Sequence, residues 1–68
     1  MTDVKTAPAE QHLYRVTDVM RMLSMSRSVI YEQLRSGRLR SVHQGRARRI
    51  PAAAVAEYVA LLEREAGQ

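Results

Sequence analysis

Arginine is the residue whose type and spacing in this chain point most directly to a chemical role. Between positions 21 and 49 the sequence holds eight arginines and a single acid, Glu32, so this segment carries a net charge of +7. Residues 1–20 sum to −1 and residues 50–68 to −2, which together give the +4 of the chain. A guanidinium donates paired hydrogen bonds to phosphate or to the edge of guanine. The segment therefore predicts a polyanionic partner, most commonly nucleic acid. The eight are Arg21, Arg27, Arg35, Arg38, Arg40, Arg46, Arg48 and Arg49.

The chain offers little for catalysis or for metal binding. It has no cysteine and only two histidines, His12 and His43. Asp18, His43 and the many serines include the residue types of a hydrolytic triad, but nothing in their spacing brings them together. We therefore expect no enzyme activity, no catalytic residue, no metal site, no cofactor and no small-molecule substrate.

Length and composition indicate one domain with a small core. A chain of 68 residues buries only roughly 60% of the surface that its unfolded state exposes, so marginal stability is expected. No run approaches the ~18 apolar residues of a membrane helix, and the N-terminus has no apolar signal core. We expect a cytoplasmic, nucleoid-associated protein without membrane contact. Its predicted parts are a flexible arm over residues 1–12, a folded domain over 13–65 and a tail over 66–68.

A short helix is expected over about residues 18–24. Thr17 is a suitable N-cap, and Asp18 behind it suits the positive end of the helix dipole. Residues 13–16 are expected as an extended lead-in, with Leu13 and Val16 on the core. The helical spacing predicts an apolar stripe formed by Val19, Met22 and Leu23.

A second helix is expected over about residues 27–36, after the turn Ser24-Met25-Ser26. Ser26 is its predicted N-cap, and Gly37 ends it as a residue that accepts the left-handed conformation. Ile30 and Leu34 share the face toward the first helix, which leaves the opposite face exposed. That opposite face is formed by Arg27, Ser28, Tyr31 and Arg35.

A two-stranded ribbon and a third helix follow. Residues 39–44 and 47–50 flank the turn at Gly45-Arg46, with Val42 and Ile50 as the inward side chains. Pro51 suits the first position of a helix over about 51–65. The apolar stripe of that helix is predicted to be Val55, Tyr58, Val59 and Leu62.

Two short helices joined by a tight turn suggest a helix-turn-helix, in which the second helix enters the major groove of DNA. Arg27 could form a bidentate pair with guanine, and Ser28 and Tyr31 suit phosphate or mixed contacts. Glu32 could accept from a cytosine amino group or orient Arg27 or Arg35. The alternative is a solvated helical face. The predicted contacts of this helix are Ser26, Arg27, Ser28, Tyr31, Glu32 and Arg35.

The ribbon is expected to follow a phosphate backbone or to enter a minor groove, as a wing beside the second helix. The alternative is a solubilising loop. Thr17, at the start of the first helix, is predicted to contact the DNA backbone near the helix amides. The predicted contacts of the wing are His43, Gln44, Arg46, Arg48 and Arg49.

The segment LSMSRSVIYEQLRSGRLRSVHQGRARRIPAAAVAEYV resembles the small excisionase-type, MerR-like winged helix-turn-helix proteins of bacteria and phages. The shared pattern includes S-R-S-x-[apolar]-Y, R-x-G-x-L and G-R-x-x-R-I-P, and it covers about residues 13–62. The resemblance implies an α+β, mostly helical fold with two helices, a two-stranded hairpin wing and a C-terminal helix. It maps the recognition helix onto residues 27–35 and the wing onto 46–49. The sequence departs from the pattern at Ser24, Gln33 and Arg48.

Such a protein is expected to act as an excisionase, also called a recombination directionality factor. Copies bind repeats of double-stranded DNA at an attachment site, associate with one another there and help an integrase to excise a mobile element or prophage. A small transcriptional regulator at a promoter is the alternative, although a helix ending near residue 65 offers no coiled-coil extension for a dimeric sensor. A protein-interaction adaptor is a third hypothesis.

Overall fold

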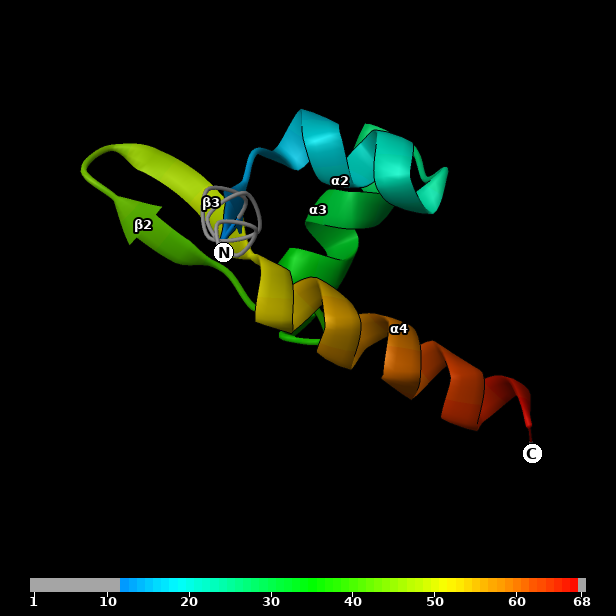
Figure 1. Ribbon diagram of the computed structural model, residues 1–68. Coiled ribbons are helices and arrows are strands. Elements are labelled where there is room, and N and C mark those ends of the chain that lie inside the picture. The colour runs from blue at the N-terminus through cyan, green and yellow to red at the C-terminus, as the bar shows by residue number, and fades with distance from the viewer. Residues whose placement is uncertain (1–11, 68) are drawn as a thin grey trace, which may run out of the picture.

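The computed structural model describes residues 12–67, so the predicted arm lies outside the described residues except for His12. The fold is a small winged helix-turn-helix with three helices and a three-stranded sheet, which confirms the predicted fold class (Figure 1). The elements in chain order are β1 (Leu13–Tyr14), α2 (Val16–Leu23), α3 (Arg27–Ser36), β2 (Val42–Gln44), β3 (Ala47–Pro51) and α4 (Ala52–Ala66).

The sheet is antiparallel and has the order β1-β3-β2. The predicted ribbon is confirmed as the pair β2–β3, in which His43 lies opposite Arg48. Its first strand starts at Val42 rather than at residue 39. The predicted lead-in becomes a third strand, because Tyr14 pairs with Ile50. This pairing places the start of α2 directly beside the base of the wing.

Helix α2 begins two residues earlier than predicted. Its N-cap is Arg15, whose backbone N–H donates to Oδ2 of Asp18 at 3.0 Å. Thr17 instead lies exposed inside the first turn, so its prediction as the cap was wrong. The physical reason is that a carboxylate at the third helical position reaches back to the amide of the cap residue, which favours a start at Val16.

Helix α3 has the predicted bounds, residues 27–36. The hydroxyl of Ser26 accepts from the backbone N–H of Val29 at 3.3 Å, and Gly37 ends the helix at φ +85°. Ser24 occupies the left-handed region at φ +55°, where the related pattern has glycine. The turn between α2 and α3 therefore keeps the conformation that glycine would provide.

Nine apolar residues form the core, and among the described residues no polar or charged side chain is buried with them. Ile30 and Leu34 of α3 are buried as predicted, so the orientation of the helix is set by its apolar stripe. The full set is Val16, Val19, Ile30, Leu34, Leu39, Ile50, Ala54, Val55 and Tyr58.

Three side chains predicted to face the core are exposed instead. Leu13 is 39% exposed, Met22 48% and Val42 38%. Their predicted places are taken by neighbours one, two or three positions away in the chain: Tyr14, Met20 and Leu39 pack on or within the core. Each error follows from a short element with apolar residues on both sides, where local periodicity does not say which side meets the rest of the molecule.

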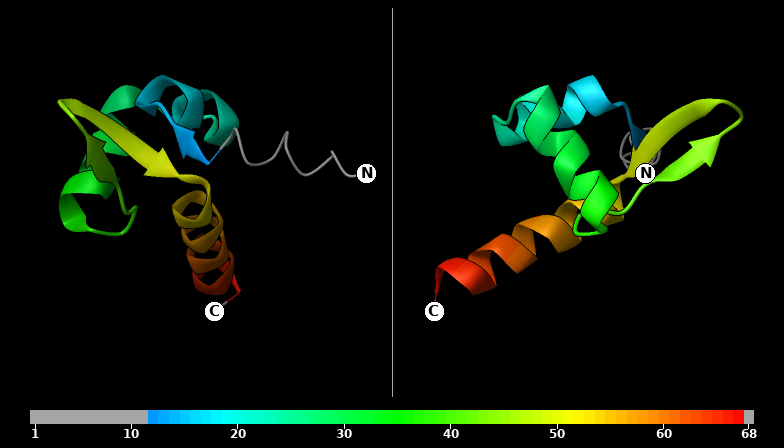
Figure 2. Two further views of the ribbon diagram at one scale, coloured as in Figure 1. Left: turned by 60° about the vertical axis from the view of Figure 1, so that its left-hand side comes forward. Right: turned by 180° about the vertical axis from the view of Figure 1, so that it is seen from behind.

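Helix α4 packs on β3 and leads away from the sheet, so that its C-terminal end lies far from the wing tip (Figures 1 and 2). Pro51 is the last residue of β3 and the N-cap residue of α4. It therefore precedes the first turn of the helix, in which it was predicted to lie. Val55 and Tyr58 are buried, and Val59 and Leu62 are partly buried against the core, as the predicted stripe requires.

Candidate nucleic-acid interface

The outward face of α3 is the first part of the candidate interface. Because Ile30 and Leu34 are buried, the residues between and beside them are turned to solvent. Tyr31 is 38% exposed and therefore accessible to a ligand, although it is an aromatic residue. The structure thus brings together on one exposed surface the predicted contact residues Ser26, Arg27, Ser28, Tyr31, Glu32 and Arg35.

Two contacts organise that face. Glu32 forms an ion pair with Arg35, one turn further along the helix, so in this structure it orients an arginine. The hydroxyls of Ser26 and Ser28 lie 3.3 Å apart beside the first turn. Among residues 12–67, Arg27 makes no ion pair, which leaves its guanidinium available at the N-terminal end of the helix.

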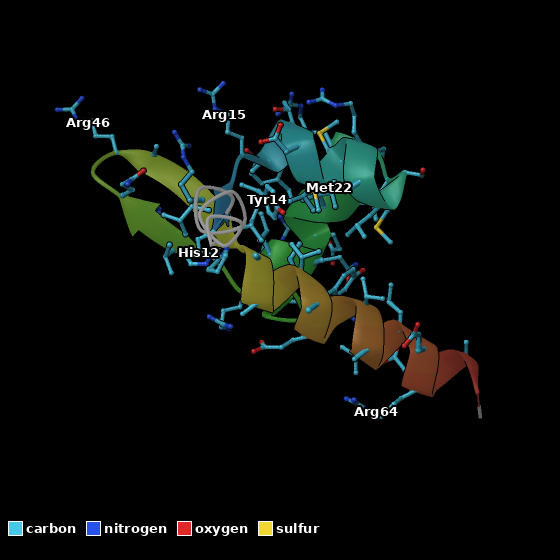
Figure 3. All side chains as sticks on the ribbon, viewed as in Figure 1. His12, Tyr14, Arg15, Met22, Arg46 and Arg64 are labelled. Atoms are coloured by element: carbon cyan, nitrogen blue, oxygen red, sulfur yellow. The ribbon has the colours of Figure 1, made fainter. Side chains whose placement is uncertain are left out.

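The wing is the second part. Arg46 lies in the turn between β2 and β3, and its side chain points away from the body of the domain (Figure 3). His43 and Gln44 on β2 are exposed. Arg48 and Arg49 are half-buried, and Nη1 of Arg49 donates to the carbonyl oxygen of Arg48 at 3.1 Å. Arg46 is therefore the wing arginine with the greatest freedom to reach a partner.

The two parts share one edge of the domain. The N-terminal end of α3, the junction of β1 with α2 and the tip of the wing lie along this edge, whereas the C-terminal end of α3 and helix α4 lie on the other side (Figures 1 and 2). We call it the basic edge and define it by Arg15, Arg46 and the N-terminal end of α3, which begins at Arg27. A duplex lying on this edge would meet both the helix and the wing.

Arg38 and Arg40 do not belong to the basic edge, although they contribute to the +7 of the segment. Arg38 donates to both carboxylate oxygens of Glu65 at 2.8 Å and to the side-chain oxygen of Gln33 at 2.9 Å. Arg40 donates to both carboxylate oxygens of Glu57, at 3.2 and 3.0 Å. Two of the eight arginines that give this segment its charge of +7 are therefore already paired with acids of helix α4.

The pair of Arg38 with Glu65 alters the ionisation of both partners. The hydrogen bonds from Arg38 hold the pKa of Glu65 below its usual value, and the same contact raises the pKa of Arg38. The acids come from α4, 17 and 27 residues further along the chain. Counting acids within the segment alone could not reveal them.

Arg15 was not among the residues that the sequence predicted as contacts. The structure makes it the N-cap of α2, and its exposed side chain extends from the same edge as Arg46 (Figure 3). A usable signal was present in the sequence, since an acid at position 18 implies a cap three residues earlier. Thr17, predicted to contact the backbone as the cap, is exposed in the first turn of the same helix.

Beside the basic edge, the surface carries a shallow hollow lined by Tyr14, Asp18, Arg21 and Met22. Within residues 12–67, no three histidine, aspartate or glutamate side chains lie close enough together to hold a metal ion. Over the same residues, no helix has the length and apolar character needed to cross a membrane.

Comparison with protein-family models matches residues 13–60 to a family described as a helix-turn-helix domain. The match covers well over half of the 68 residues, and the chain belongs to this family. Membership implies DNA binding, in agreement with the exposed face of α3 and the arginine-bearing wing. No curated protein and no solved structure matches the chain.

Proposed function

We propose that this protein binds specific sequences of double-stranded DNA and acts as an excisionase, assisting an integrase in the excision of a mobile element. The observation that carries the proposal is the basic edge, along which the N-terminal end of α3 and the tip of the wing both lie. The family of helix-turn-helix domains to which the chain belongs includes excisionase-like proteins.

The two parts of the basic edge suit different components of DNA. Arg27, near the start of α3, can reach base edges in the major groove, where a guanidinium pairs with guanine through two hydrogen bonds. Arg46, at the tip of a two-stranded ribbon, suits phosphates or a narrow minor groove. Simultaneous contact of Arg27 and Arg46 with one duplex favours bent or wrapped DNA, because bending brings two parts of the duplex within reach of one small domain.

The role that we infer is architectural rather than catalytic. Copies would bind adjacent repeats at an attachment site, contact one another on the DNA and shape it for the integrase. Smoothly bending a DNA site of about 20–30 base pairs costs on the order of 1–6 kcal/mol. Phosphate contacts and contacts between neighbouring copies would offset this cost.

The test is a footprint of the purified protein on the DNA that flanks its own gene, titrated to reveal cooperativity. Several phased repeats that fill cooperatively beside an integrase attachment site are the expected result. A single short protected block over a promoter would instead assign the protein to transcriptional control. Absence of protection on any flanking DNA would refute DNA binding at these sites and favour an adaptor that meets an acidic protein.

A further inference from the structure

Arg15 stands where the sheet and the helix-turn-helix meet. The preceding residue, Tyr14, pairs with Ile50 of β3. The amide of Arg15 donates to Oδ2 of Asp18 at 3.0 Å, and its carbonyl oxygen accepts from the amides of Asp18 and Val19 at 3.0 and 3.2 Å. Strand pairing on one side and the helix start on the other therefore hold its backbone in place.

The side chain of Arg15, by contrast, makes no ion pair within residues 12–67. Asp18, the carboxylate that contacts its backbone, also accepts from Nη2 of Arg21 at 3.1 Å through its other oxygen. Both oxygens of Asp18 thus already have a donor. Arg15 is exposed and projects from the basic edge in the same general direction as Arg46 (Figure 3).

We propose that Arg15 contacts DNA and binds a backbone phosphate that lies between the part of the duplex contacted by α3 and the part contacted by the wing. This inference rests on the proposed function. The β1–α2 junction lies between the wing and the N-terminal end of α3 on the basic edge, so a duplex that engages both passes over it (Figures 1 and 2). In helix-turn-helix docking the first helix crosses the backbone, and a guanidinium fork matches two phosphate oxygens.

A contact with phosphate differs from a contact with a base in its effect on binding. It carries no sequence information, so its loss weakens binding to specific and random duplexes alike. It also releases about 0.9 of a counterion for each phosphate neutralised on B-form DNA, which appears in the slope of log Kobs against log salt concentration.

The experiment compares wild-type protein with Arg15→Gln by fluorescence anisotropy over a range of salt concentrations, using a duplex that contains the footprinted site and a random duplex. We expect affinity for both duplexes to fall several-fold by the same factor and the salt slope to become shallower by about 0.9. Arg15→Lys, which keeps the charge, should largely keep the slope. Arg64→Gln on α4 makes the same change in net charge far from the basic edge and should leave the slope at the wild-type value.

A second measurement needs no variant and therefore does not depend on the folding of one. An arginine-selective reagent is applied to the wild-type protein with and without DNA, and the modified sites are read by mass spectrometry. DNA should protect Arg15 and leave Arg64 reactive. Equal modification of Arg15 in both samples would overturn its assignment as a contact.

The outcomes separate this proposal from the proposed function. If the wild-type protein binds its site specifically while Arg15→Gln retains both the wild-type affinity and the wild-type slope, the assignment of Arg15 is wrong and the function stands. If the wild-type protein binds neither duplex, both proposals fail together.

Discussion

At the residue scale, Arg27 is the side chain best placed to discriminate between bases, because it is exposed in the first turn of α3 and has no ion-pair partner among the described residues. We expect Arg27→Ala to cost about 1–3 kcal/mol of binding free energy at the specific site and to relax discrimination at one base pair. Binding to a set of duplexes, each with one base pair replaced, measures the effect. An unchanged preference at every position would show that α3 does not use Arg27 in the groove.

Glu32 illustrates how structure narrows a choice that the sequence left open. From residue types alone it could accept from a cytosine or orient a neighbouring arginine. The structure pairs it with Arg35, which favours the orienting role while the protein is free. An exposed pair of this kind contributes little to stability, so DNA can draw Arg35 away at small cost.

At the scale of single elements, the end of α3 depends on Gly37. Its φ of +85° is unfavourable for any residue with a Cβ, although an added Cβ would meet nothing within 4 Å. We therefore expect Gly37→Ala to lower the free energy of unfolding by about 1–2 kcal/mol through backbone strain alone. Gly67→Ala is the matched control, because Gly67 has φ −80° and tolerates a Cβ in ordinary contact. Urea denaturation compares the two; equal midpoints would contradict the assignment of strain to Gly37.

The attachment of the C-terminal end of α4 is expected to depend on pH through Glu65. Its pKa in the folded protein lies below the unfolded value of about 4.5, because Arg38 donates two hydrogen bonds to it. The resulting stabilisation is complete above the unfolded pKa and is lost as the pH falls through the folded pKa. Wild-type stability should therefore drop more steeply with acidification than that of Glu65→Gln, as measured by thermal melting from neutral to acidic pH. Parallel curves would show that the pair contributes nothing.

How far the sequence predicts each element depends on whether the decisive interaction is local. The bounds of α3 follow from Ser26 and Gly37, whose capping roles involve only neighbouring residues, and they were predicted correctly. The start of α2 was missed because a carboxylate at position 18 outweighed the hydroxyl of Thr17.

Local sequence patterns could not predict the features that depend on contacts between residues far apart in the chain. Leu39 rather than Val42 enters the core because the chain after α3 folds back on that helix, where the amide of Leu39 donates to the carbonyl oxygen of Gln33 at 3.1 Å, and no periodicity encodes that path. The carboxylates that occupy Arg38 and Arg40 likewise become visible only once α4 is placed. The residues on the outward face of α3, by contrast, were predictable from the helical spacing of Ile30 and Leu34.

At the scale of the whole molecule, the number of positive charges in the sequence differs from the number that is available to contact DNA. Of the arginines between 21 and 49, Arg40 is paired with Glu57 of helix α4, whereas Arg46 lies in the turn at the wing tip. We expect Arg46→Gln to make the salt slope of DNA binding shallower by about 0.9 and Arg40→Gln to leave it unchanged. Equal effects of the two substitutions would mean that DNA responds to net charge rather than to particular contacts.

The small core has a consequence for the lifetime of the molecule. Among the described residues nine apolar side chains form the core, and for a core this small we expect the unfolded chain to be populated enough for a protease to cleave it. A ligand that binds only the folded state lowers the population of the open state in proportion to its occupancy. Copies seated on DNA would therefore be degraded more slowly than copies in free solution. The number of DNA sites that the protein can occupy would then set how much of it persists.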